Sequence, residues 1–185
     1  MQVTLPRLHS LKLSLDNTTF GVLSSWDMPL LKNVLVVSSD FSYTGEGFSL
    51  FFKQHGSKVS QLELGHSSST IEEHYLTNTR QVIPIPLADW CPNLREFICS
   101  ADAKWHWESP DWIAPHVLLP SHPTLQLIVI HDIHTRLLNP DFSDDLDTLF
   151  FLLIEQVYFL LRKDTFPNLQ FIWDLSLHSH FMRTQ

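Results

Sequence analysis

The chain has 185 residues, enough for one domain with a substantial core, and its 44% hydrophobic and 17% charged residues are ordinary for a globular protein. The formal net charge of -8 disfavours nucleic-acid binding, because phosphate groups repel an acidic chain and no basic stripe offsets the charge. The two cysteines, Cys91 and Cys99, have the spacing neither of a metal site nor of a disulfide framework. Their small number is typical of a reducing compartment.

The N-terminal residues lack the basic and apolar regions of a signal peptide, so we expect an intracellular protein, in the cytoplasm or the nucleus. The most apolar run, 149–161, is shorter than the ~20 residues of a membrane span and contains Glu155 and Gln156. It is therefore predicted to be a buried amphipathic helix, and no membrane association is expected.

A short motif recurs six times along the chain. Each copy has an apolar anchor that opens an LxxLxL-like spacing, and in five copies a proline lies two residues before the anchor. The copies are LPRLHSLKL, MPLLKNVLV, GSKVSQLEL, CPNLREFIC, HPTLQLIVI and FPNLQFIWD, with anchors Leu8, Leu31, Val59, Leu94, Leu125 and Leu169. Because side chains alternate along a strand, the third and fifth residues after the anchor face one side. Each copy therefore predicts a turn followed by a strand with a buried face.

The residues around the anchors suit this interpretation. A proline ends the preceding helix and favours extended backbone where the chain enters the strand. In the third copy Gly56 takes its place, and we expect it to end a helix as a left-handed cap. The sixth copy is irregular, because Asp174 falls where an apolar residue belongs.

Helix-like segments separate the predicted strands. They span 18–26, 46–55, 86–90, 109–117 and 143–163. The last is the longest, with Ser143 suited to cap it and with Arg162 and Lys163 suited to its C-terminal end. The alternation predicts an α/β fold: a leucine-rich-repeat solenoid of about six repeats, with a parallel sheet on one face and irregular helices and loops on the other. We expect residues 1–185 to form this single domain. The first strand begins near residue 8 without a polar cap before it, which indicates either a chain cut from a longer solenoid or a truncated gene product.

The repeats depart from a strict pattern. The spacing between successive anchors runs from 23 to 44 residues, whereas regular leucine-rich repeats span ~20–29. The Asn or Cys that usually closes each strand loop is also missing. Those positions hold Asp16, Ser39, Ser67, Asp102, Ile133 and Leu177. A plain βα domain without solenoid geometry therefore remains an alternative.

Four segments resemble the leucine-rich-repeat region of fungal F-box-like proteins, especially the expanded mushroom-type sets. They are LSSWDMPLL, WCPNLREFICSAD, LLPSHPTL and DTFPNLQFI, and the resemblance covers nearly the whole chain. It implies a family in which an F-box recruits the adaptor of a cullin-RING ubiquitin ligase and the repeats select a substrate. No F-box-like helical segment precedes the first repeat, so only substrate recognition carries over. A ligase adaptor is expected as a partner only of a longer form that has an F-box.

Motifs for catalysis or cofactor binding are missing from the sequence: it has no phosphate-binding loop, GxGxxG, GxSxG or HExxH. His131 and His134 fall on opposite faces of a strand, which is unfavourable for a shared metal. We therefore predict no catalytic, cofactor-binding or metal-ligating residues and no cofactor, and we expect that the chain is not an enzyme.

The strand residues that face away from the core suggest a binding surface. The second residues after the anchors are Ser10, Asn33, Gln61, Glu96, Leu127 and Phe171, and the fourth are Lys12, Leu35, Glu63, Ile98, Val129 and Trp173. These positions are mostly polar in the first repeats and apolar in the last two, so either a partner or the chain's own insertions should cover the apolar ones. The candidate protein-binding residues are Ile98, Leu127, Val129, His131, Phe171 and Trp173.

A secondary candidate is the aromatic cluster Trp105, Trp107 and Trp112 in the long insertion of the fourth repeat. These side chains either fold back over the core or form an exposed contact site.

We therefore expect a protein-interaction module that binds an unknown protein partner through a concave strand face. One alternative is an α/β enzyme fragment with strand–helix units, although its strand-end residues, such as Asp16 and Ser39, have no obvious base beside them. Another is a degenerate, non-functional family member.

Overall fold

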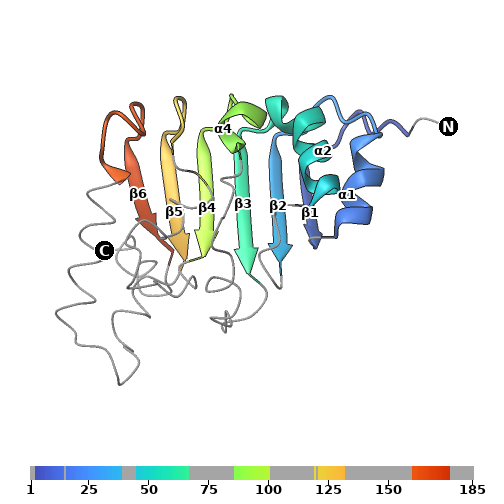
Figure 1. Ribbon diagram of the computed structural model, residues 1–185, viewed down its shortest axis with the longest axis horizontal. Helices are drawn as coiled ribbons and strands as arrows, with labels where there is room; N and C mark the ends of the chain where they lie inside the picture. Colours follow the sequence, from blue (N-terminus) through green and yellow to red (C-terminus); the bar gives the residue numbers. More distant parts are fainter. Residues whose placement is uncertain are drawn as a thin grey trace, which may run out of the picture.

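The computed structural model describes residues 3–14, 16–38, 45–66, 86–100, 119, 121–131 and 160–175. Six strands and three α-helices lie in this part of the chain (Figure 1). The strands are β1 Ser10–Ser14, β2 Asn33–Ser38, β3 Gln61–His66, β4 Glu96–Ser100, β5 Leu127–His131 and β6 Phe171–Asp174. The helices are α1 Asn17–Ser24, α2 Glu46–His55 and α4 Leu87–Trp90, and a 3-10 turn, η1 Gly56–Lys58, follows α2.

The strands form one parallel sheet in chain order, β1 to β6. Equivalent residues of successive copies lie side by side: Leu11 pairs with Val34, Val34 with Leu62, and Leu62 with Phe97. The same register continues through Ile128 to Ile172. The prediction of an α/β fold with a parallel sheet is therefore confirmed, and so is the alignment of the six copies.

The core lies on one face of this sheet. Five of the six anchors are buried, and Leu8, beside the first strand, is partly buried and packs against the core. The inward strand positions are buried in β2, β3 and β5, and Phe97 is buried in β4, while Leu11 and Ile172 on the outer strands are partly buried. Alternation along the strands therefore divides buried from exposed side chains as the spacing predicted.

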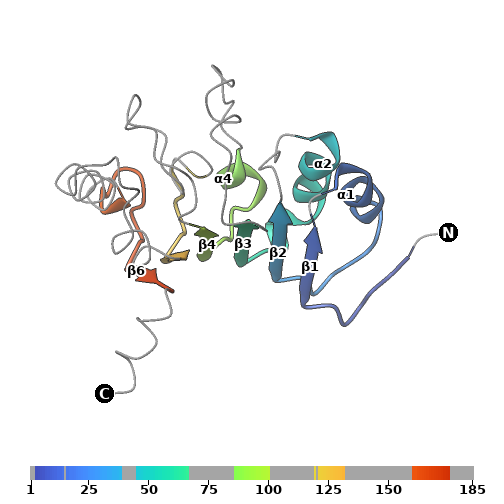
Figure 2. The ribbon, with the colours of Figure 1, turned by 90° about the horizontal axis from the view of Figure 1, so that it is seen from below.

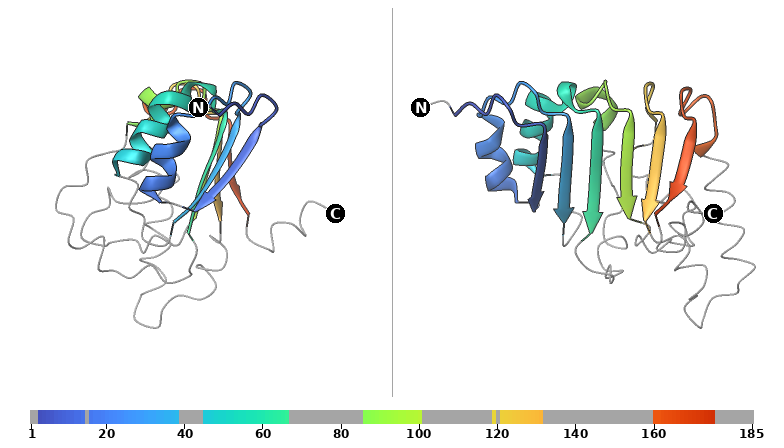
Figure 3. Two further views of the ribbon diagram at one scale, coloured as in Figure 1. Left: turned by 90° about the vertical axis from the view of Figure 1, so that its right-hand side faces the viewer. Right: turned by 180° about the vertical axis from the view of Figure 1, so that it is seen from behind.

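Helices α1 and α2 pack against this buried face, and the opposite face of the sheet has no described helix (Figures 2 and 3). A cluster of four aromatic rings joins the two helices, with the Phe20 ring centroid 5.6 Å from Phe48 and 5.1 Å from Phe51. The main chains also approach closely, since a Cβ on Gly47 would overlap the carbonyl oxygen of Asn17. The Phe48 amide donates to Asn17 Oδ1 at 3.2 Å.

The helix predictions agree in part with the structure. The segment 46–55 coincides with Glu46–His55, whereas α1 and α4 are shorter than the segments 18–26 and 86–90. The segment 109–117 lies outside the described residues, as does most of 143–163. Leu160 is helical but a turn begins at Leu161, so the predicted end at Lys163 was too late.

A recurring turn precedes the strands. The anchor amide donates to the carbonyl three residues earlier, at 3.3 Å from Leu31 to Met28 and 3.0 Å from Leu94 to Cys91. The proline of the motif therefore occupies the second position of a β-turn, where its fixed φ is favourable. In the third copy Gly56 has φ -59°, so the predicted left-handed cap was wrong. A glycine is needed because a Cβ there would overlap the Trp90 carbonyl oxygen.

The turns are also linked from one copy to the next. After each of the first five anchors, the carbonyl of the next residue accepts two amides of the following copy. His9, for example, accepts from Lys32 at 2.9 Å and from Asn33 at 3.0 Å. Side chains add a second link in the later copies. Asn93 Nδ2 donates to the Ser57 carbonyl, Thr124 Oγ1 to Pro92 and Asn168 Nδ2 to Pro123, at 2.7, 2.9 and 2.6 Å. We call these three contacts the turn ladder.

Candidate protein-binding face

The face of the sheet that points away from α1 and α2 carries the residues two and four positions after each anchor. We call it the open face. The register places the predicted columns in two straight rows, one from Ser10 to Phe171 and the other from Lys12 to Trp173. In the view along the strands the sheet follows a shallow arc, with the helices on its outer side (Figure 2). Ile98, Leu127, Val129, Phe171 and Trp173 thus lie together on the inner side of the arc.

The apolar half of the open face is only partly accessible. Phe171 and Trp173 are 54% and 40% exposed, their ring centroids lie 6.4 Å apart, and Leu127 beside Phe171 is half-buried. Ile98 and Val129, in contrast, are only 8% and 4% exposed. They point to the predicted face, but atoms of the chain itself already cover them, so they are not available to a partner.

The difference follows from position in the sheet. Val129 lies between Ile98 and Trp173, so neighbours shield a small branched side chain on both sides. Phe171 and Trp173 belong to β6, the last strand of the described sheet, and their rings extend beyond their smaller neighbours. We call Leu127, Phe171 and Trp173 the aromatic patch.

The remaining predicted site residues are His131 and the three tryptophans of the fourth-repeat insertion. His131 is the last residue of β5 and pairs with Ser100 in the register. Trp105, Trp107 and Trp112 lie outside the described residues, so the secondary candidate stays a prediction.

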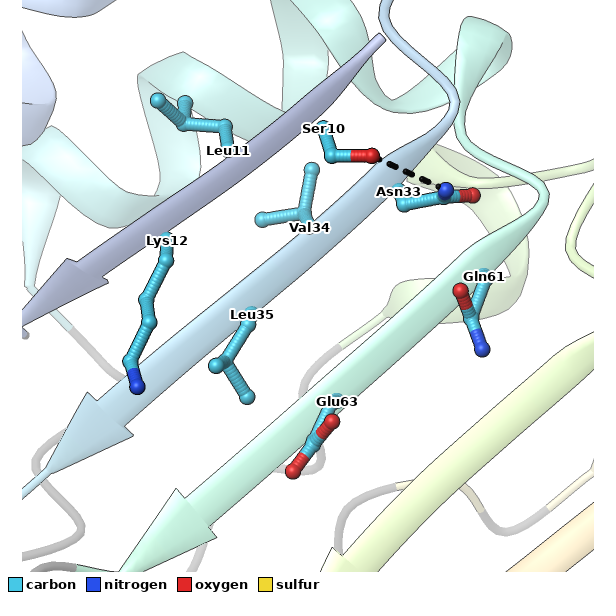
Figure 4. A pocket seen from close by; sticks show the side chains of 8 residues that line it. All are labelled: Ser10, Leu11, Lys12, Asn33, Val34, Leu35, Gln61 and Glu63. Carbon is cyan, nitrogen blue, oxygen red and sulfur yellow. Dashed lines mark hydrogen bonds between the residues drawn. The ribbon is translucent and has the colours of Figure 1, made fainter.

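The polar half of the open face spans β1 to β4 and was not singled out from the sequence. Asn33 Nδ2 donates to Ser10 Oγ at 3.1 Å, and Gln61 Nε2 donates to Glu96 Oε2 at 3.1 Å. A shallow depression of about 320 Å³ lies over β1 to β3 (Figure 4). Lys12, Leu35, Gln61 and Glu63 are among its lining residues. The polar residues that recur two and four positions after the anchors of the first copies could have located this polar surface from the sequence.

Two histidines are buried in the core, away from the open face. His122 Nε2 donates to the Cys91 carbonyl at 3.0 Å, while its Nδ1 accepts from the Thr124 amide at 3.3 Å. In His55, Nε2 lies 3.2 Å from the Leu23 carbonyl oxygen, and Nδ1 lies 3.3 Å from Lys58 Nζ. Burial lowers the pKa of both imidazoles. This bonding pattern requires neutral rings, each with one donor and one acceptor nitrogen.

Metal-binding side chains do not converge in the described part of the chain. No three His, Cys, Asp or Glu side chains there are placed to hold a metal ion. The Cys91 thiol is a core group, and burial raises its pKa to about 12. The open face therefore offers aromatic contact area, hydrogen-bonding groups and charges.

Comparisons with known proteins identify no relative: no protein-family model, no curated protein and no solved structure matches the chain. Among the helices of the described residues, none is long and apolar enough to cross a membrane.

Proposed function

We propose that the chain is a leucine-rich-repeat solenoid that binds another protein through its open face, with the aromatic patch as the central contact. The solenoid is supported by the recurring turn, the parallel strand order and the aligned register of the six copies. Each copy has a buried face that it cannot cover alone, and stacking of neighbouring copies supplies the core.

The observation that carries the binding proposal is the exposure of Phe171 and Trp173 side by side on a face without described helices. Moving large aromatic side chains from water into a contact with a partner is favourable. Trp is also enriched among the residues that dominate binding energy. A contiguous exposed apolar patch on a folded domain is typical of an interaction site.

The resemblance to F-box-like proteins extends this proposal. Binding through the open face would correspond to substrate recognition within a ubiquitin ligase. The ligase adaptor would join only through an F-box in a longer form of the protein. Capture of the adaptor by the longer form but not by residues 1–185 is the result that this part of the proposal expects.

Site-specific photocrosslinking tests the binding proposal directly. A photoreactive amino acid replaces Trp173 or Phe171 in the whole chain, which is expressed and irradiated in its source cells. The matched control places the same amino acid at Leu50, which is 44% exposed on α2. We expect a discrete crosslinked protein from the aromatic patch that is missing from the Leu50 control.

A competition experiment tests whether the crosslink depends on the two aromatic rings. Excess unmodified chain should suppress the crosslink, whereas excess Phe171→Ala/Trp173→Ala double variant should not. Equal crosslinking from Leu50 and from the patch would contradict a specific binding face. So would suppression by both competitors, because the aromatic rings would then contribute nothing to binding.

A further inference from the structure

We infer that the partner segment bound by the open face carries an arginine or lysine about three or four residues away from an apolar or aromatic anchor residue. This inference rests on the proposed function and adds the chemistry of the partner. The anchor would contact the aromatic patch, and the basic side chain would contact the carboxylates of Glu63 and Glu96.

The charges on the open face are unevenly placed. Glu96 pairs with Leu127 in the register, and Glu63 pairs with Ile98, so both carboxylates border the apolar half. Lys12 lies two strands beyond Glu63, on β1 at the far side of the sheet. Within the described part of the open face, a basic side chain beside the aromatic patch therefore lies nearer to two acidic groups than to Lys12.

Glu96 is positioned to accept a further donor. Gln61 Nε2 donates to its Oε2 at 3.1 Å and holds the half-buried carboxylate on the face. A carboxylate has about four acceptor sites on its two oxygens, so this bond leaves room for a guanidinium or an ammonium group. The contact would be charge-assisted, and such hydrogen bonds are stronger than neutral ones.

The surface beside Glu63 is slightly depressed. Gln61 and Glu63 line the depression of about 320 Å³ over β1 to β3 (Figure 4), a volume at the lower end of the 300–1,000 Å³ found for ligand sites. Glu63 is therefore one of the residues at the edge of this depression.

The geometry of the sheet gives the spacing. Glu96 and Phe171 are two strands apart in one row, and Glu63 and Trp173 are three strands apart in the other. At ~4.8 Å per strand, these separations are roughly 10 and 14 Å. An extended segment advances ~3.4 Å per residue, so about three or four residues separate the basic side chain from the anchor.

A second copy of the chain is a poorer occupant of the same face. In the described part of the face, two copies facing each other would bring together four glutamates but only two copies of Lys12, and each chain carries a net charge of -8. Like charges across an interface weaken association and slow the encounter. The charge of this face thus favours a basic partner segment over self-association.

Selection from a display library of random linear peptides tests the inference on the whole chain. We expect enrichment of peptides with a basic residue three or four positions from a large apolar one. The Glu63→Gln/Glu96→Gln variant should bind the selected peptides roughly three- to tenfold more weakly and with a flatter dependence on salt. The Phe171→Ala/Trp173→Ala variant should lose binding, whereas the Leu50→Ala control should bind as the unchanged chain does.

The outcomes separate the two proposals. Selected peptides that need Trp173 but show no basic preference would overturn the inference and leave the proposed function standing. Equal affinity of the glutamine variant, at low and high salt, would overturn it as well. Failure to select any peptide that depends on Phe171 or Trp173 would overturn both. Far-ultraviolet circular dichroism of each variant verifies that the folded chain was tested.

Discussion

His55 and His122 connect parts of the core that are far apart in sequence. Each ring donates to a carbonyl about 30 residues earlier: His55 to Leu23 and His122 to Cys91. Both side chains are fully buried, so their hydrogen bonds replace water and must be complete. A proton added to either ring would remove its acceptor nitrogen and place a charge in the core.

The first prediction is that the free energy of unfolding falls as pH decreases below about 6.5. Because burial lowers the pKa of both histidines in the folded state, the unfolded chain takes up protons first. The full stability is therefore present above the ordinary pKa of 6.5 and is lost as pH falls towards the folded pKa. For His55 the nearby Lys58 ammonium lowers the pKa further, while Asp27 raises it. Urea unfolding at about pH 7.5 and 5.5 measures the change.

The control is His122→Gln, which retains a donor for the Cys91 carbonyl but does not titrate. We expect it to be less stable than the unchanged chain at pH 7.5, by about 1 kcal/mol, because the Thr124 amide loses its acceptor. Between the two pH values it should lose less stability than the unchanged chain. Equal losses would mean that His122 does not contribute to the pH dependence.

Among the structural elements, the turns contribute more contacts between neighbouring copies than their loop-like sequence suggests. The side chain before the anchor in one copy bonds to a turn carbonyl of the previous copy, as Asn168 does to Pro123 at 2.6 Å. The backbone ladder runs beside it, with Gln126 accepting from both Gln170 and Phe171. These contacts fix the offset between neighbouring copies, and hence the register of the open face.

The second prediction therefore concerns the turn ladder. Asn168→Ala should lower the free energy of unfolding by about 0.5–1.5 kcal/mol, because it removes the hydrogen bond to the Pro123 carbonyl. Gln170→Ala, at an exposed position of the same segment, should change it by less than about 0.5 kcal/mol. Chemical denaturation of both variants gives the comparison, and equal effects would show that the Asn168 contact of the ladder contributes nothing to stability.

The third prediction uses two glycines in the packed helices. Gly47→Ala should destabilise the protein by about 1–3 kcal/mol, because the added methyl group would overlap the Asn17 carbonyl oxygen and push α1 from α2. Gly21→Ala adds the same group to α1, where nothing lies within 4 Å. This control should be neutral or stabilising by up to about 1 kcal/mol. Thermal unfolding that ranks the two variants in the opposite order would rule out this packing of the helices.

Periodicity explains what could be predicted about these elements. The strand residues and their register followed from spacing, because alternation is a local property of each segment. The role of Gly56 did not follow, because it depends on Trp90, which lies 34 residues later in the chain. The burial of Ile98 and Val129 also depends on the side chains of neighbouring strands, so the sequence predicted their face but not their burial.

For the whole molecule, the strand order means that each copy stacks on its immediate neighbours. In the described sheet, β1 and β6 have a partner on one side, and β2 to β5 have partners on both sides. In the solenoid proposed above, stability would be approximately the sum of the stabilities of the units and of the contacts between neighbours. The end strands should therefore open more readily than the central ones.

Native-state hydrogen exchange tests this fourth prediction. We expect amides of β3 and β4 to exchange most slowly, with opening free energies near that of global unfolding, and amides of β1 and β6 to exchange faster. The burial pattern supports the order, since Leu62 and Phe97 are fully buried while Leu11 and Ile172 are only partly so. Uniform protection of all six strands would indicate one cooperative unit and contradict stacking of separable copies. Because the aromatic patch lies mainly on β6, a peptide bound there should slow exchange in β6 far more than in β3.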